Sequence, residues 1–417
     1  MINAGENKNI EWIREIPKNH ENILKDIIAF SNSTGGRLYI GIEDGTGIVY
    51  GIGDASPFRM SDALSNMISA ACTPQIEPDI SMETMDGKTV LVVDVPAGRF
   101  RPYYMKHKGK EASTYVRING TSRVADAAKL RELELEGDRV SYDSLREIGQ
   151  EFDEEKAKKL CEKMKQRALA NCRNDEEREA VKDLTIDKLI DFDLLGKNGS
   201  ELFPTHAFDL LCENHNHAAK IQCALFKGTT RSVFVDKKEF IGPIDEQLEE
   251  AYQFVLRHTN LGATINGLYR DETYELPVTA VREMIANAVI HRSYVNRSCI
   301  QVSMYDDRIE VDSPGTLYGG MDIETAISGR SMCRNEAIAE AFHYMKIVET
   351  WGTGIPRIMD SCIEYGLPAP EFKESGNGFK AILYKGANQE PKGANQEPKG
   401  ADQEPNQCAL KKKSVLL

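Results

Sequence analysis

The sequence contains no apolar stretch that approaches the ~18 residues of a membrane-spanning helix. Its first residues, MINAGENKNIEW, lack the pattern of a signal peptide. The 9 cysteines include no Cys-x-x-Cys pair and follow no regular spacing, so neither a disulfide framework nor a zinc site is indicated. The phosphate-binding loop G-x-x-x-x-G-K-[ST] is also absent, which excludes a motor helicase that depends on its lysine. Together these absences predict a cytoplasmic protein with reduced thiols and no membrane segment.

A chain of 417 residues is too long for one ordinary hydrophobic core, so two or three domains are expected. The net charge of −13 argues against nucleic-acid binding by the whole surface, although it allows a local basic patch.

The pattern of apolar residues predicts two mixed α/β units, so the expected fold class is α/β or α+β. In the first, residues 1–130, a helix at HENILKDIIAF precedes the strands RLYIGI and IVYGI, which are expected to pair as a hairpin around EDGTG. Charged residues dominate 131–183, where EEKAKKLCEKMKQRALANC predicts a connecting helix. The second unit spans 184–384.

Residues 385–417 differ from the rest of the chain. KGANQEP occurs at 385 and 392, and KGADQEP follows at 399. The seven-residue repeat carries no large apolar side chain, which excludes a coiled coil and predicts a disordered tail.

Residues 281–294, VREMIANAVIHRSY, predict an amphipathic helix with a polar stripe. Glu283, Asn287 and His291 are spaced four residues apart, about one helical turn, so they share one face. The other faces carry ample apolar surface for burial. The stripe is therefore expected to face a ligand. The alternative is a hydrogen-bonded polar seam in a domain that has lost its ligand.

Two downstream motifs could complete a nucleotide site. CIQVSMYDDRIEVDSPG predicts two strands, and ETWGTGIPRI places Gly352 and Gly354 just before a helix. Glycines let backbone amides approach an anion closely, and a helix N-terminus favours phosphate. In such a site Glu283 would orient the attacking water, and Asn287 would offer its amide oxygen to Mg²⁺.

These motifs, with EFIGPIDEQLEEA and SMCRNEAIAEAF, resemble the GHKL ATPases, the superfamily of DNA gyrase and the histidine kinases. More narrowly, residues 184–384 are similar to the divergent GHKL domain of bacterial proteins labelled ATP-binding or, doubtfully, DNA helicase. The resemblance implies ATP and Mg²⁺ as cofactors and a homo-oligomer, a dimer or larger. It also implies a nucleotide lid around Arg330 to Asn335 and a set of nucleotide-binding residues: Asn287 (with Mg²⁺), His291, Asp312, Gly315, Arg330, Arg334, Asn335, Gly352, Thr353 and Gly354. One departure is that the adenine-binding turn reads DSPGTLYGG instead of Asp-x-Gly-x-Gly, which predicts a weakened contact between Asp312 and adenine.

AFSNSTGGRLYIGIED, with ENKNIEWIRE before it and YVRINGTSRVA after it, resembles the AlbA_2 or Schlafen-type domain over residues 6–128. That family binds nucleic acid, and some Schlafen members cut tRNA with three carboxylates. The resemblance implies Glu6, Glu11 and either Glu43 or Asp44 as candidates, which could hold a divalent metal for phosphodiester hydrolysis. The alternative is that these are surface acids beside a turn.

Residues 99–123 concentrate positive charge against a single acid, Glu111. Basic side chains neutralise phosphates, and aromatic faces stack on unpaired bases. The candidate contacts are Arg99, Arg101, Lys106, Lys108, Lys110, Arg117, Arg123, Tyr103 and Tyr104. The alternative is a solvated loop with tyrosines in the core.

The sequence thus predicts an ATP-binding, nucleic-acid-binding protein in which a GHKL-type site switches an AlbA_2-type DNA- or RNA-binding domain. Transcription regulation and defence against foreign nucleic acid are the settings considered. Two alternatives stay open: a Schlafen-like metal-dependent nuclease, and a nucleotide-free DNA-binding regulator.

Overall fold

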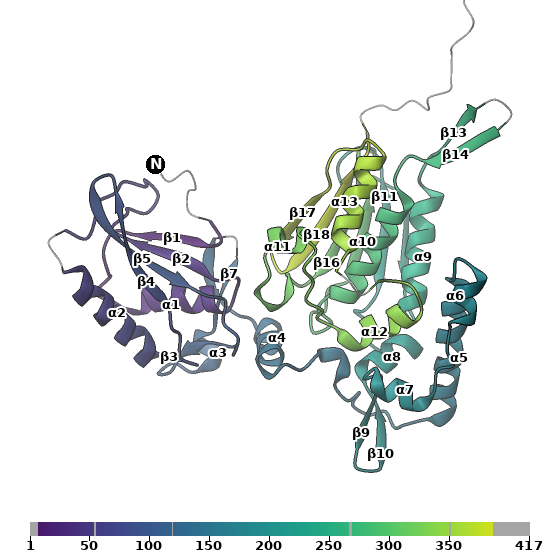
Figure 1. Cartoon of the computed structure of the whole chain (residues 1–417), viewed down its shortest axis with the longest axis horizontal. Helices are drawn as coiled ribbons and strands as arrows, with labels where there is room; N and C mark the ends of the chain where they lie inside the picture. Colours follow the sequence, from purple (N-terminus) through teal and green to yellow (C-terminus); the bar gives the residue numbers. More distant parts are fainter. Residues whose placement is uncertain (1–6, 54–55, 119, 267–268, 350–351, 387–417) are drawn as a thin grey trace, which may run out of the picture.

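The structure is a computed structural model that describes residues 7–53, 56–118, 120–266, 269–349 and 352–386. Two α/β units lie on either side of helix α4 (Ala127–Asp138), as Figure 1 shows. The predicted mixed α/β class is confirmed. None of the helices in the described part of the chain is long and apolar enough to cross a membrane. The predicted tail lies outside the described residues from 387 onward.

The first unit is built on a four-stranded sheet in the order β1-β2-β5-β4. Strand β1 runs parallel to β2, and the other neighbours are antiparallel. The strands are β1 (Ile10–Ile13), β2 (Gly36–Ile40), β4 (Asp79–Met85) and β5 (Lys88–Val95). Five short elements follow or intervene: β3 (Cys72–Thr73), β6 (Tyr104–Met105), α3 (Lys110–Ser113), β7 (Tyr115–Ile118) and β8 (Thr121–Val124).

Side chains alternate across this sheet, so its two faces form two separate apolar clusters. Helices α1 (Glu21–Ser31) and α2 (Pro57–Ala71) pack on the face that carries Leu38 and Leu91. The other face forms a smaller cluster around Trp12 and Tyr39. The predicted hairpin around EDGTG forms only at its turn end: Ile42 bridges Val49, and the amides of Glu43 and Tyr50 donate to the carbonyls of Ile48 (3.0 Å) and Gly41 (2.8 Å). Strand β2 itself pairs with β1 and β5 instead of with residues 48–52.

The second unit is built on a six-stranded sheet in the order β12-β11-β15-β16-β18-β17. Helices α9 (Ile244–Arg257), α10 (Val278–His291) and α13 (Gly354–Glu364) cover one face of it (Figure 1). The strands are β11 (Ile221–Phe226), β12 (Phe234–Phe240), β15 (Ile300–Met304), β16 (Arg308–Pro314), β17 (Glu371–Ser375) and β18 (Gly378–Tyr384). The hairpin of β13 (Leu261–Asn266) and β14 (Tyr269–Tyr274) projects beyond the sheet (Figure 1).

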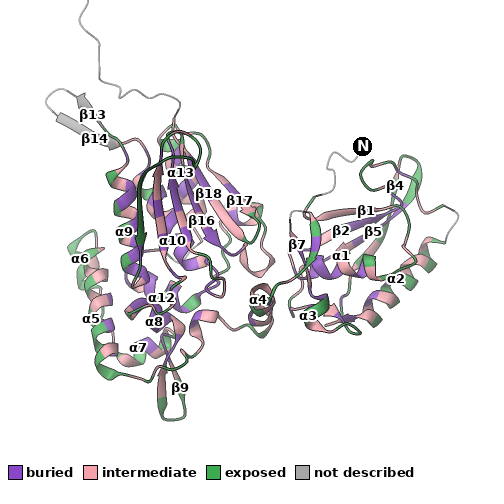
Figure 2. Ribbon diagram, turned by 180° about the vertical axis from the view of Figure 1, so that it is seen from behind, coloured by how far each residue is buried: buried purple, intermediate pink, exposed green. Residues whose placement is uncertain are grey.

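Helix α5 (Glu154–Ala170), which contains most of the predicted connecting helix, shares the hydrophobic core of the second unit. Ala157, Leu160 and Met164 are buried in the same cluster as the sheet and α10 (Figure 2). The other small elements of this unit are α6 (Asp175–Glu179), α7 (Ile186–Asp191), β9 (Leu195–Asn198), β10 (Glu201–Pro204), α8 (His206–Cys212), α11 (Ile323–Ile327) and α12 (Glu336–Tyr344).

Candidate functional site

The polar stripe of α10 lies against the glycine loop that begins α13. A Cβ atom added to Gly354 would come within 2.6 Å of Glu283 Oε1 and 2.8 Å of Asn287 Nδ2. The backbone of the loop can reach both side chains because residue 354 has no side chain. The structure therefore brings together the stripe at residues 283–291 and the glycine motif at 352–354, which lie far apart in the sequence.

The segment predicted to form a nucleotide lid contacts the same loop. Gly352 has a φ of 68°, which favours glycine, and a Cβ atom there would lie 2.5 Å from the carbonyl oxygen of Gly329. Gly329 immediately precedes Arg330, the first residue of the predicted lid. The lid segment and the glycine loop are thus in contact through backbone atoms.

A cavity of about 410 Å³ lies between α10, α13, the sheet and the lid segment. The predicted site residues that line it are Glu283, Asn287, His291, Gly315, Arg330, Gly352 and Gly354. Apolar side chains form another part of its wall: Met284, Val311, Phe372, Phe379 and Ala381. A mostly apolar cleft with a few convergent polar groups is typical of a site for a small organic ligand, and this one combines an apolar wall with phosphate-compatible glycines.

Two titratable groups of the stripe are shifted by their surroundings. Burial raises the pKa of Glu283, and Arg357 and Arg282 oppose this shift. Burial, together with the charge of Arg334, lowers the pKa of His291 to about 4. His291 is therefore neutral near pH 7, and Glu283 is a stronger base than an exposed glutamate.

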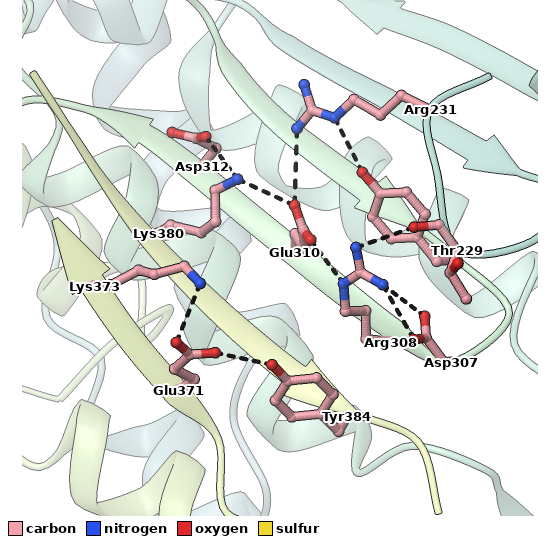
Figure 3. Close-up of polar contacts among 11 residues, drawn as sticks. Thr229, Arg231, Asp307, Arg308, Glu310, Asp312, Glu371, Lys373, Lys380 and Tyr384 are labelled. Atoms are coloured by element: carbon pink, nitrogen blue, oxygen red, sulfur yellow. Dashed lines mark hydrogen bonds and ion pairs between the residues drawn. The ribbon is translucent and has the colours of Figure 1, made fainter. Parts of the chain in front are cut away.

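Asp312 does not line this cavity. Strand β16 alternates, so Val311 and Ser313 face the cavity and Asp312 faces the opposite side of the sheet. There its carboxylate lies 3.4 Å from Lys380 Nζ (Figure 3). The buried Ser313 hydroxyl, which donates to the carbonyl of Ala288 at 3.0 Å, takes the inward position. Sequence reasoning missed Ser313, although the period of two along β16 would have placed these neighbours on opposite faces.

Three more of the predicted nucleotide-binding residues do not line the cavity, and two of them hold its walls in place. Asn335 is fully buried, and its Nδ2 donates to the carbonyls of Ile290 (2.6 Å) and Arg292 (2.8 Å) at the end of α10. Arg334 is also buried and donates to the carbonyl of Thr316 at 2.6 Å. Thr353 is the N-cap residue of α13.

The donor set at the stripe fits a Mg²⁺ ion that a nucleotide brings with it. Magnesium is usually bound by one or two protein oxygens together with phosphates and waters, so a full protein cage is not required. Asn287 would supply an amide oxygen to such an ion, and Glu283 would supply a carboxylate one turn away. Within the described residues no group of three or more His, Cys, Asp and Glu side chains could hold a metal.

The acids of the first unit surround a buried arginine. Arg117 donates to Glu11 Oε2 at 2.9 Å and lies 3.6 Å from Asp26 Oδ1, which accepts a hydrogen bond from Ser122. Burial and the charge of Asp26 raise the pKa of Glu11, whereas Arg117 lowers it. Sequence reasoning missed Asp26, although it is a lone acid in the apolar helix ILKDIIAF.

The other acids of the predicted nuclease cluster are placed differently. Glu43 accepts a hydrogen bond from the Thr46 hydroxyl at 2.8 Å within its own turn. The charge of Asp44 contributes to the raised pKa of Glu11. Glu6 lies outside the described residues.

The basic stretch divides into buried and exposed side chains. Arg101, Tyr103 and Arg117 are buried, so these three predicted contacts do not lie at the surface, where nucleic acid could reach them. The Arg101 guanidinium pairs with Glu136 at 2.6 Å and also donates to the carbonyl of Ser33. A buried guanidinium needs such partners, which take these cations away from the surface.

The remaining cations of the stretch are exposed or partly exposed. Lys108 pairs with Glu21 and Lys110 pairs with Glu134, both at 2.6 Å. Arg99, Lys106 and Arg123 are exposed, and none of them forms an ion pair with another described residue. Phe100 is 61 % exposed and Tyr104 is partly exposed. The basic surface is therefore smaller than the sequence predicts, and we define it as Arg99, Lys106 and Arg123.

Comparison with known families supports both resemblances. Residues 6–126 match the family model described as "Schlafen, AlbA_2". Residues 298–383 match the model described as "Putative ATP-dependent DNA helicase recG C-terminal". The expected combination of domains is confirmed, and the two matches suggest an ATP-binding and nucleic-acid-binding protein. The second match begins after α10, so it includes the glycine loop but not the polar stripe.

Among solved structures, the chain is similar to the DIP2311 protein from Corynebacterium diphtheriae, with 20% identity and a TM-score of 0.47 over 90% of this chain and 75% of that one. It is also similar to the N-terminal domain of a putative ATP-dependent DNA helicase RecG-related protein from Nitrosomonas europaea, with 23% identity and a TM-score of 0.22 over 30% of this chain and 88% of that one. No curated protein matches the chain.

Proposed function

We propose that the protein is a nucleotide-controlled nucleic-acid-binding protein. In this proposal Mg-ATP binds the cavity beside α10, and its presence changes the affinity of the first unit for DNA or RNA. Transcription regulation and defence against foreign nucleic acid would both suit such a switch.

One observation carries this proposal: the loop 315–320 forms a wall of the cavity and also touches the first unit. Gly315, Thr316, Leu317 and Tyr318 line the cavity. At the far end of the loop, a Cβ atom on Gly320 would lie 2.6 Å from Arg101 Nη2 of the first unit. A ligand that moves this wall must therefore also disturb the contact between the units.

Two side chains connect the same loop to the first unit and to α4. Glu374 accepts a hydrogen bond from the Leu317 amide at 2.9 Å and forms an ion pair with Lys8. Arg334, which donates to Thr316, lies 3.3 Å from Glu132 of α4. Since these contacts are ionic and partly buried, a shift of the loop would change their energy by more than an exposed pair would.

The stripe and the glycine loop have the chemistry for slow hydrolysis. Glu283, with its raised pKa, would hold and polarise the attacking water. Asn287 would hold Mg²⁺, which neutralises charge on the phosphates when it is bound. Amides near Gly352 and Gly354 would contact the phosphates at the start of α13. We also propose a homo-oligomer whose size depends on bound nucleotide.

Calorimetry of Mg-ATP binding tests the site. Asn287→Ala should abolish binding, whereas Glu283→Ala should keep binding and remove any turnover. Unchanged Mg-ATP binding by Asn287→Ala would rule out the site. Light scattering with and without a non-hydrolysable ATP analogue tests the change of size.

The switch is tested by the affinity for an oligonucleotide with and without the same analogue. Glu374→Gln keeps an acceptor for the Leu317 amide but removes the charge that pairs with Lys8, so the effect of ATP on nucleic-acid affinity should shrink. Glu371→Gln is the matched control, because Glu371 lies on the same strand and pairs with Lys373 and Tyr384 instead (Figure 3). Equal ATP effects in both variants and the wild type would contradict coupling through Glu374.

A further inference from the structure

A second cavity, of about 920 Å³, lies on the side of the six-stranded sheet opposite α10. It is lined by residues from three loops: 215–220 after α8, 296–299 before β15, and 375–378 between β17 and β18. Asp312, which faces away from the nucleotide cavity, lies in its wall. We call this cavity the sheet groove. None of its residues lines the nucleotide cavity.

The sheet groove contains an unpaired guanidinium, that of Arg297, on an acidic chain. Arg297 and His217 line it, are exposed, and form no ion pair with any described residue. A hydrogen bond to Asp209 raises the pKa of His215, and the same carboxylate balances the charge of its protonated form. Lys220 is likewise paired, with Glu239 at 2.9 Å. On a chain whose net charge is −13, an exposed and unpaired guanidinium in a groove favours an anionic ligand.

Acids near the groove are already matched by cations. Asp312 is the carboxylate among the lining residues, and it lies 3.4 Å from Lys380. Glu310, two residues earlier on β16, is paired with Arg308 at 2.7 Å and Lys380 at 3.1 Å (Figure 3). These ion pairs leave the unpaired Arg297 of the groove without a competing acid on β16.

Amide side chains add neutral donors to the groove. Asn296 uses its Oδ1 to accept from the Ser298 amide at 2.9 Å, which leaves its Nδ2 available. The backbone carbonyl of Asn377 accepts a hydrogen bond from the Gly315 amide, so the side-chain amide of Asn377 is also available to a ligand. Phosphate oxygens in nucleic-acid complexes are bound by this mixture of Arg, Asn, Gln and Ser groups.

The sheet groove continues into the junction between the two units. Asn377 also lines a smaller cavity of about 120 Å³ there, together with Lys8, Arg123 and Lys129 of the first unit and α4. Lys8 pairs with Glu374 and Lys129 pairs with Glu132, whereas Arg123 forms no ion pair with a described residue. Arg123 is one of the three cations of the basic surface. The two cavities therefore carry an unpaired cation at either end, Arg123 and Arg297, with the Asn377 side chain between them.

We propose that a nucleic-acid strand bound by the first unit extends along a path from Arg123, past Asn377, into the sheet groove, so that the groove contacts its phosphates through Arg297 and His217. The proposal rests on the nucleic-acid binding proposed above and adds a second contact region on the ATPase-like unit. A strand that crosses the junction would also rest beside Glu374 and loop 315–320, where the nucleotide cavity is closed.

Fluorescence anisotropy with single strands of two lengths, about 6 and about 16 nucleotides, tests this path. Arg297→Glu should weaken binding of the long strand about tenfold and reduce its salt slope by about one, while binding of the short strand is unchanged. Arg257→Glu is the matched control, because Arg257 is exposed on α9, makes no ion pair with a described residue and does not line the groove. Its affinities should equal those of the wild type.

If Arg297→Glu and Arg257→Glu bind the long strand equally, the sheet groove is not part of the path, whatever the first unit does. If the wild type binds neither strand, nucleic-acid binding itself is refuted, and so is the proposed contact with the sheet groove. Because Arg297 is exposed and unpaired, its variant is expected to keep the thermal midpoint of the wild type, and a circular dichroism melt checks this.

Discussion

Gly354→Ala should damage the nucleotide site while leaving the fold almost unchanged. The new Cβ atom would lie 2.6 Å from Glu283 Oε1 and 2.8 Å from Asn287 Nδ2, closer than real Cβ contacts come. Both side chains would have to move together, and they are the two groups proposed to hold the water and Mg²⁺. The backbone at residue 354 has no positive φ and begins a helix, so alanine itself is tolerated there.

The magnitudes separate function from stability. The two displaced atoms are the ends of flexible side chains, so we expect a folding cost of about 1 kcal/mol or less and a change in Tm of about 2–4 °C. A displacement of about 1 Å at a reacting group can lower a rate about 100-fold, which corresponds to about 2.7 kcal/mol in the barrier. We therefore expect Mg-ATP affinity to fall by about tenfold or more and any turnover by about 100-fold.

Calorimetry with Mg-ATP, a phosphate-release assay and a thermal melt measure these three quantities. Gly45→Ala is the control: Gly45 has a φ of 74° and a Cβ atom there meets nothing within 4 Å, so this variant carries backbone strain without touching the cavity. Wild-type affinity and turnover in Gly354→Ala would refute the assignment of Glu283 and Asn287 to the nucleotide site.

Four further outcomes are expected. Ser313→Ala should weaken ADP binding and Asp312→Ala should not, because Ser313 faces the nucleotide cavity and Asp312 faces the sheet groove. If calorimetry shows that Asp312→Ala weakens ADP binding and Ser313→Ala does not, the orientation assigned to β16 is wrong. Arg117→Met should lower the free energy of unfolding by about 3 kcal/mol in urea, since it leaves Glu11 and Asp26 without their cation, whereas the exposed Lys106→Met should have little effect. The pKa of His291 is lowered to about 4, so between pH 4 and the ordinary pKa of about 6.5 the unfolded chain binds more protons than the folded chain. The free energy of unfolding should therefore fall as the pH drops through this window. His291→Gln should flatten the dependence of Tm on pH. Finally, the purified protein should cleave neither tRNA nor single strands with any divalent metal, and metal-dependent cleavage that disappears in Glu11→Gln would favour the nuclease over the switch.

Much of the local structure could be predicted from the sequence, because it depends on short-range periodicity. The predicted helix at 281–294 overlaps α10 (Val278–His291), and the two strands expected around the Asp306–Asp307 turn are β15 and β16. The polar stripe and the glycine loop could be recognised for the same reason, since helical spacing and a Gly-Thr-Gly motif are properties of a few neighbouring residues.

Pairings between distant parts of the chain could not be predicted in this way. The hairpin expected after β2 is limited to the bridge between Ile42 and Val49, because β5, about 50 residues further on, pairs with the strand edge of β2. Asp312 and Ser313 are neighbours on a strand, and their alternation was readable, but only the packing of α10 on one face of the sheet decided which of them meets the nucleotide cavity.

The sequence by itself determined that residues 99–123 are rich in cations, and that acids, amides and glycines occur at spacings suited to a nucleotide site. Only the tertiary structure decided which cations remain available. Arg117 and Arg101 are buried in ion pairs with Glu11 and Glu136, whereas Arg123 is exposed. The physical reason is that a charge is available to a ligand only when no partner has already neutralised and buried it, and that partner can lie anywhere in the chain.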